Sequence, residues 1–257
     1  MSFWEHLAEL RARLFRAALA LIVGIAITWW KREWFLAFLV RPLRRGYRAL
    51  GRDMPPLHFA GPADAFSAYM QMSLVGGLFL ASPFVLWELW SFVSPGLYGS
   101  EKKKAIPIVL LASVSFVGGA WYGYQSVLPL GFEFFLSFST TARSVAIQDI
   151  LMMDRVLETT TKILLAFGLV FEMPLILMLL GMIGVVDHRM LWKFSRWAIL
   201  IIVVVAAFLT PPEVLTQVFM AGPMIVMYFL SIGLVWMVGR KKREATGDRG
   251  QATGNRQ

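Results

Sequence analysis

The stretch ILLAFGLVFEMPLILMLLGMI, residues 163–183, carries one charged residue, Glu172, in 21 positions. A helix of about 20 mainly apolar residues can cross the hydrocarbon core of a bilayer, where backbone groups must be hydrogen-bonded within the segment. The stretch therefore predicts a membrane-spanning helix. The whole chain agrees, because 58% of its residues are hydrophobic and 16% are charged, against roughly 25% charged in soluble domains.

Similar apolar runs recur along the chain and predict an all-α integral membrane protein with six transmembrane helices. The runs cover residues 15–30, 65–92, 106–130, 156–183, 194–209 and 214–238. The fifth run is barely long enough to span a bilayer. We expect residues 1–239 to form a single six-helix membrane domain. Residues 240–257 are polar and lack apolar periodicity, which predicts a disordered cytoplasmic tail.

The distribution of Lys and Arg favours a topology with both termini in the cytoplasm. With six spans, the N-terminus, the 93–105 loop, the 184–193 loop and the C-terminus share one side, and that side holds most of these cations. The opposite loop at 31–64 is also rich in arginine, and its Trp and Phe residues predict a short interfacial helix. We interpret the net charge of +9 as contact with anionic lipid rather than with nucleic acid.

Several classes of function are excluded by what the sequence lacks. It has no cysteine, which excludes disulfides, Fe–S clusters and Cys-based zinc sites, and its three histidines lie far apart. No HExxH, GxSxG, Walker or GxGxxG motif occurs, and no spacing suggests a nucleophile and a base on facing helices. We therefore predict no catalytic residue, no metal and no cofactor.

Three carboxylates occupy positions that suggest a site. Glu9 faces Arg13 one helical turn further on, and Glu101 precedes three lysines in a Pro-Gly turn. Each of these acids is either an ordinary surface group or an acceptor for a cationic partner. Glu172 lies inside the fourth span beside Pro174, which we expect to kink the helix. A carboxylate there is either bonded within the bundle or functional.

Further polar residues lie at the connection between the last two predicted spans. Two prolines after Thr210 force an abrupt reversal, and Glu213 can cap the sixth helix. Gln217 falls one turn inside that helix, where its amide can hydrogen-bond to another helix. From the residues alone, the acids serve either a partner protein or a solute or ion transporter that uses Glu172 and Lys162 as a coupling pair.

Four motifs occur in order on or beside the predicted spans. They are FWEHLAELRAR at 3–13, FVSPGLYGSE at 92–101, FGLVFEMP at 167–174 and TPP at 210–212. Together they resemble one known family, the TatC subunit of the twin-arginine protein translocase, over about residues 3–238. The sequence departs from the family at Glu213, where Asp is usual, a change of one methylene that keeps the charge.

The resemblance implies a concave, cupped bundle of six helices in the inner or plasma membrane, with cytoplasmic termini. It implies a core subunit of the twin-arginine translocation (Tat) system that binds twin-arginine signal peptides of folded proteins. Such a subunit scaffolds TatA- and TatB-type single-span partners, and we expect it to self-associate in a receptor complex. Transport in the family is driven by the proton-motive force.

The same resemblance assigns residues to two sites. Those that match the family's signal-peptide site are Glu9, Glu101, Arg11, Phe92, Pro95, Leu97 and Tyr98. Those assigned to intramembrane partner contact are Glu172, Gln217 and Glu213. A twin-arginine motif presents two planar guanidiniums, each able to form two hydrogen bonds to a carboxylate, and lysine cannot reproduce that fork. Glu9 and Glu101 are the acceptors that the resemblance predicts.

Overall fold

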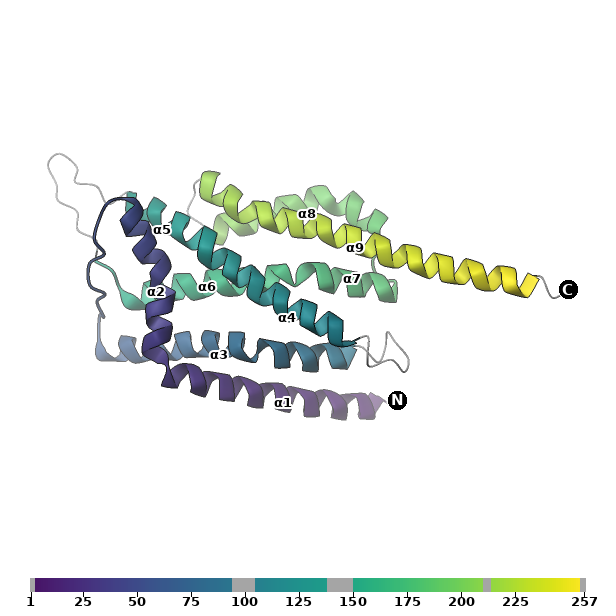
Figure 1. The fold of residues 1–257 in the computed structure, drawn as a ribbon, viewed down its shortest axis with the longest axis horizontal. Helices are drawn as coiled ribbons and strands as arrows, with labels where there is room; N and C mark the ends of the chain where they lie inside the picture. The colour runs from purple at the N-terminus through teal and green to yellow at the C-terminus, as the bar shows by residue number, and fades with distance from the viewer. Residues whose placement is uncertain (1–2, 94–104, 138–149, 210–213, 255–257) are drawn as a thin grey trace. The chain divides into compact units, whose positions relative to one another are not determined.

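The computed structural model describes residues 3–93, 105–137, 150–209 and 214–254 of the chain. These residues form helices joined by short connections, which confirms the all-α prediction (Figure 1). The chain divides into two compact units, Met1–Leu169 and Val170–Gln257.

The first unit contains the helices up to Leu169, near the end of α6. They are α1 (Phe3–Trp30), α2 (Arg32–Ala49), α3 (Pro62–Val93), α4 (Ala105–Tyr122), the π-helical turn η3 (Gly123–Val127), α5 (Leu128–Ser137) and α6 (Met153–Phe171). The second unit begins with the last residues of α6. It continues with α7 (Met173–Ile183), α8 (His188–Leu209) and α9 (Val214–Gly254).

Helices α1 and α3 lie side by side in the first unit (Figure 1). Their backbones touch where glycines face each other, since a methyl group added to Gly24 would lie 2.5 Å from the carbonyl oxygen of Gly77. One turn further along α1, the buried Thr28 hydroxyl donates to the carbonyl of Gly24 at 2.9 Å. Small residues allow such close approach between apolar helices. The register of α1 on α3 is therefore fixed by direct backbone contact.

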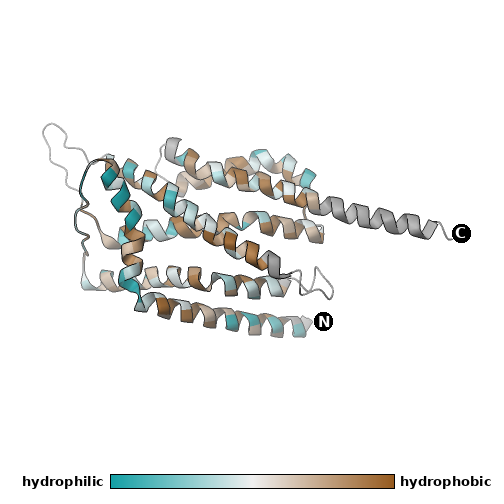
Figure 2. Ribbon diagram, in the orientation of Figure 1, coloured by the Kyte–Doolittle hydropathy of each residue, from teal (hydrophilic) through white to brown (hydrophobic). Residues whose placement is uncertain are grey.

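Helix α2 is the helix that the 31–64 loop predicts, and it is longer than expected. It buries Leu39, Leu43 and Tyr47, and it packs against α5. The contact is close at Gly46, where an added methyl group would lie 3.0 Å from the backbone nitrogen of Glu133. Figure 2 shows hydrophilic residues along α2 and at the N-terminal end of α1. The loop thus contributes to the core of the first unit.

The third predicted span is helical but not uniform. Helix α4 passes into the π-helical turn η3 and then into α5, so the helical path runs past residue 130 to Ser137. Within the turn, Gln125 accepts a hydrogen bond from Arg45 of α2. Tyr124 donates its hydroxyl hydrogen to the carbonyl of Phe38 at 2.7 Å. The wider turn directs two polar groups toward α2, which hydropathy could not predict.

Four helical stretches within the described residues are long and apolar enough to cross a membrane. They are Pro62–Phe92, Met153–Ile183, His188–Phe208 and Gln217–Met237. They correspond to the second, fourth, fifth and sixth predicted runs. The fifth run was predicted too short, because α8 begins at His188 and not at residue 194. The first turns of α8 contain Lys and Arg residues, which lower the local hydropathy and so kept these turns out of the predicted apolar run. The first and third predicted runs are contained in α1 and in the path from α4 to α5.

In the second unit, α9 packs against both α7 and α8. An added methyl group at Gly181 would lie 2.9 Å from a side-chain carbon of Val235, so α7 and α9 are close there. Tyr228 of α9 donates its hydroxyl hydrogen to the carbonyl of Leu191 at 2.8 Å, which ties α9 to α8. Gly184 ends α7 with φ +84°, a left-handed conformation that glycine adopts without strain.

The C-terminal end of the last helix lies in the segment whose composition predicts a disordered tail. Helix α9 runs from Val214 to Gly254, and the predicted disorder of residues 240–257 stays a prediction. Residues 240–245 are Arg, Lys, Lys, Arg, Glu and Ala, which are strong helix formers, and no proline follows Val238. Once a helix has been nucleated, each residue added to its end forms one more backbone hydrogen bond without a new nucleation cost.

Candidate functional site

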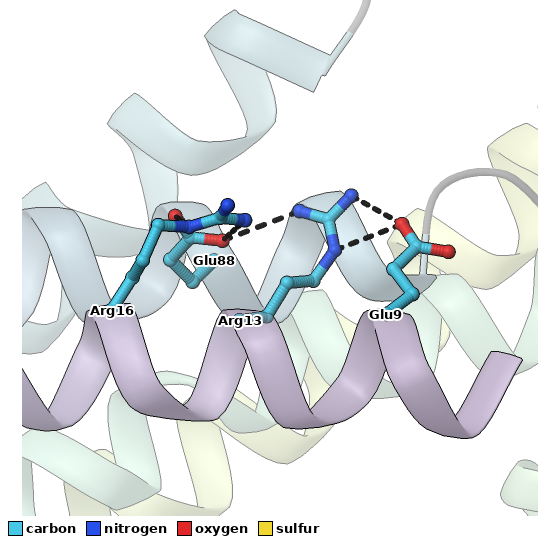
Figure 3. Close-up of polar contacts among 4 residues, drawn as sticks. All are labelled: Glu9, Arg13, Arg16 and Glu88. Atoms are coloured by element: carbon cyan, nitrogen blue, oxygen red, sulfur yellow. Dashed lines mark hydrogen bonds and ion pairs between the residues drawn. The ribbon is translucent and has the colours of Figure 1, made fainter. Parts of the chain in front are cut away.

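The first candidate residue, Glu9, lies near the N-terminal end of α1 and is bonded to an arginine. Arg13 donates to Glu9 Oε1 from Nε at 3.0 Å and from Nη2 at 2.6 Å (Figure 3). The spacing of four residues places the two side chains on one face of the helix. The predicted Glu9–Arg13 pair is therefore confirmed.

Glu88 of α3 joins this pair and was missed by the sequence analysis. Its Oε2 accepts from Arg13 Nη1 at 3.3 Å. Arg16 of α1 donates to Glu88 through two atoms, from Nε to Oε1 at 2.7 Å and from Nη2 to Oε2 at 3.0 Å. Figure 3 shows the resulting row from Glu9 through Arg13 and Glu88 to Arg16. We call these four residues the arginine–glutamate row.

The row balances its own charge with two carboxylates and two guanidiniums. Glu88 is only 6% exposed, whereas Arg16 reaches the surface. A buried carboxylate is tolerated when charged partners and hydrogen bonds compensate for its lost hydration. A signal for Glu88 was present in the sequence, because it is a carboxylate inside the predicted second span. The rule that singled out Glu172 applies to it equally.

The other predicted residues of this site are only partly described by the structure. Arg11 is exposed on α1, and Phe92 is half-buried at the last turn of α3. Glu101, Pro95, Leu97 and Tyr98 lie outside the described residues. Their assignment to the site stays a prediction.

Glu172 lies at a break between two helices, as the neighbouring proline predicts. Helix α6 ends at Phe171 and α7 begins at Met173, with Pro174 in its first turn. The Glu172 carbonyl accepts from the backbone nitrogens of Leu175 and Ile176 at 3.1 and 3.0 Å. The side chain is 5% exposed, and its Oε1 has no hydrogen-bond partner among the described residues. A buried polar atom without a partner is costly and suggests a functional role.

The remaining candidates have different environments. Gln217 donates from Nε2 to the carbonyl of Val203 at 3.1 Å, so its amide does bond to another helix, α8. Glu213 lies outside the described residues. Lys162 is 63% exposed and pairs with Glu158 at 2.5 Å, which leaves it engaged on its own helix. In the described part of the chain, no group of three or more Asp, Glu or His residues could hold a metal ion.

Comparison with known proteins identifies the family. The sequence profile of the family described as "Sec-independent protein translocase protein (TatC)" matches residues 5–223. The chain belongs to the TatC family. A TatC protein from Desulforapulum autotrophicum is 42% identical over 240 residues, which cover 93% of this chain and 86% of that protein. The TatC protein of Aquifex aeolicus is 33% identical over 95% of this chain and 98% of its own length.

Solved structures of TatC agree with this assignment. A crystal structure described as the twin-arginine translocase receptor TatC aligns with a TM-score of 0.75 and 32% identity, covering 91% of this chain and 99% of that one. A second, in DDM, aligns with a TM-score of 0.76 and 33% identity, covering 89% and 98% of the two chains. This TatC-family chain is thus a multi-pass membrane protein and a protein translocase component. The solute-transporter interpretation is not supported, since the relatives are translocase proteins and Lys162 is bound by Glu158.

Proposed function

We propose that this chain is the receptor subunit of the Tat system and binds twin-arginine signal peptides of folded proteins. The observation that supports the proposal is that Glu9 already holds a guanidinium through two N–H groups. A peptide arginine would make the same kind of charge-assisted contact, which a lysine cannot reproduce in geometry. The family motifs add six further residues to the proposed site, namely Glu101, Arg11, Phe92, Pro95, Leu97 and Tyr98.

The proposal places the chain in the inner or plasma membrane as a cupped bundle of six spans with both termini in the cytoplasm. The four apolar stretches supply the second, fourth, fifth and sixth spans. Helix α1 and the path from α4 to α5 supply the other two. The excess of Lys and Arg on the side of the termini supports the orientation.

We further propose that the chain scaffolds TatA- and TatB-type single-span helices, self-associates in a receptor complex and serves transport driven by the proton-motive force. Glu172 is the proposed partner contact, because its buried Oε1 lacks a hydrogen bond within the described residues. Gln217 and Glu213 are proposed to extend that polar patch. A donor on a partner helix would satisfy the Glu172 oxygen.

Site-specific photocrosslinking tests the binding site. Photoreactive residues placed one at a time across 5–13 and 94–104 should capture a signal peptide with two consecutive arginines, and capture should fall sharply with its Lys-Lys counterpart. Glu9→Gln or Glu101→Gln should reduce crosslinking to a low residual level because each removes a charged acceptor. Glu158→Gln is the matched control, since it removes another ion-paired carboxylate of the first unit. Unchanged crosslinking in both site variants would overturn the site assignment.

Cysteine labelling tests the topology, and the chain has no native cysteine to interfere. Asp53→Cys lies between α2 and α3, and Arg189→Cys lies in the first turn of α8. In intact spheroplasts, a membrane-impermeant maleimide should label position 53 and should reach position 189 only after lysis. The unmodified chain is the blank. The reverse pattern would contradict the proposed orientation.

A further inference from the structure

The two oxygens of the Glu9 carboxylate are used unequally. Both N–H groups that Arg13 directs at Glu9 donate to Oε1. No described residue donates to Oε2, which carries no dashed line in Figure 3. The Glu9 side chain is about one-quarter exposed, so its carboxylate is within reach of a donor from outside the chain. One oxygen is thus held by Arg13, while the other has no donor among the described residues.

Arg13 is itself fixed from a second helix. Three of its nitrogens donate to two carboxylates, Glu9 on α1 and Glu88 on α3. A guanidinium is planar and rigid, so binding on two sides sets its orientation. Glu88 is in turn held by two N–H groups of Arg16. The row therefore links the buried carboxylate of α3 to the open carboxylate of α1.

We propose that Glu88 is a positioning residue for arginine recognition: through Arg13 it fixes the Glu9 carboxylate with Oε2 open to an incoming guanidinium. The inference rests on the proposed function, in which Glu9 binds a peptide arginine. Glu88 does not touch the peptide in this scheme. It determines how Glu9 is presented.

Charge balance gives Glu88 a second effect on Glu9. Arg16 is close enough to Glu9 to interact with its charge, although the two are not hydrogen-bonded. Without the Glu88 carboxylate, Arg13 and Arg16 would share Glu9 as their acceptor, and their donors would compete for Oε2. A peptide arginine would then have to displace a resident one. Glu88 therefore keeps Oε2 of Glu9 available by holding both native arginines.

The effect of Glu88 on binding is separable from the packing of its helix. Backbone contact at Gly24 and Gly77 joins α1 to α3 independently of the row. Glu88→Gln keeps the side-chain volume and one acceptor oxygen, so the helix pair should still form. The amide has one acceptor oxygen in place of two and no negative charge, so it cannot accept all three arginine hydrogen bonds or balance the charge of the two guanidiniums.

The experiment is peptide photocrosslinking to the full chain in membrane vesicles, titrated with a synthetic Arg-Arg signal peptide and its Lys-Lys counterpart. Glu88→Gln should raise the Arg-Arg concentration for half-maximal crosslinking about tenfold, as expected for coupled neighbours. The Glu88→Gln variant should also show a smaller difference in half-maximal concentration between the Arg-Arg and the Lys-Lys peptide. Glu88→Asp, which keeps the charge, should restore part of the affinity. The control Glu158→Gln should leave both values unchanged.

A double-mutant cycle separates the outcomes. If Glu88 acts through Glu9, adding Glu88→Gln to a Glu9→Gln chain should cause no further loss of the residual crosslinking. An equal loss in both backgrounds would overturn the positioning role and indicate a general structural effect. If Glu9→Gln sharply weakens binding while Glu88→Gln leaves affinity and selectivity intact, this inference fails and the proposed function stands. If Glu9→Gln itself has no effect, the proposed site is wrong.

Discussion

Glu88 and Glu172 are both carboxylates buried within long apolar helices, yet their surroundings are opposite. Glu88 accepts hydrogen bonds from two arginines of a neighbouring helix. Glu172 sits at a helix break, and one of its oxygens has no partner in the described part of the chain. The first acid is satisfied by its own fold, while the second retains an unmet hydrogen bond. Burial alone does not tell whether a carboxylate stabilises its own chain or binds a partner protein. The hydrogen bonds that the carboxylate makes within the chain separate the two cases.

The largest expected effect is the loss of the satisfied acid. Glu88→Ala leaves Arg13 and Arg16 without their shared acceptor and should lower the free energy of unfolding by about 3 kcal/mol, because removing one partner leaves uncompensated charge. Thermal unfolding of the purified chain in detergent measures this. Glu158→Ala, whose partners are exposed, should leave the unfolding temperature nearly unchanged, because exposed ion pairs contribute little to stability. Equal effects of the two variants would contradict the structural importance of the row.

A smaller effect is expected from changing the helix spacing that brings Glu88 to its arginines. A methyl group at Gly77 would lie 2.5 Å from the backbone nitrogen of Ile25, so Gly77→Ala must push α1 away from α3. We expect a loss of about 2 kcal/mol from overpacking, with weaker Arg-Arg crosslinking as the row opens. The same unfolding assay measures it. Gly118→Ala, which would meet nothing within 4 Å, should cost nothing, and a similar loss there would refute the spacing argument.

The smallest change in the free energy of unfolding is expected at Glu172, and it should be a gain in stability where the two preceding variants lose stability. Glu172→Leu removes a buried oxygen that has no partner among the described residues and should raise the unfolding free energy by about 1 kcal/mol. The same change should abolish co-purification of TatA- and TatB-type partners. Thr160→Val removes another buried oxygen without a partner and should leave assembly intact. Normal assembly of the Glu172 variant would count against its proposed contact.

The sequence predicted those parts of the fold and site that depend on local spacing. The Glu9–Arg13 pair followed from one helical turn, and the break at Glu172 followed from Pro174. The contact between Arg16 and Glu88 joins residues 72 positions apart. It depends on the register of α1 on α3, which the glycine contact sets and which no local pattern contains. The start of α8 was missed because its first turns are polar.

The glycine contact between α1 and α3 has a mechanical consequence for the acid at the end of α1. Gly24 and Glu9 are 15 residues apart on one helix, or roughly 22 Å at 1.5 Å per residue. The glycine contact can act as a pivot about which α1 tilts, and the first turns of α1 are then the part of the helix that moves furthest. A tilt of about 5° at this pivot moves Glu9 by roughly 2 Å. A displacement of that size is enough to make or break a hydrogen bond at Glu9 without separating the two helices.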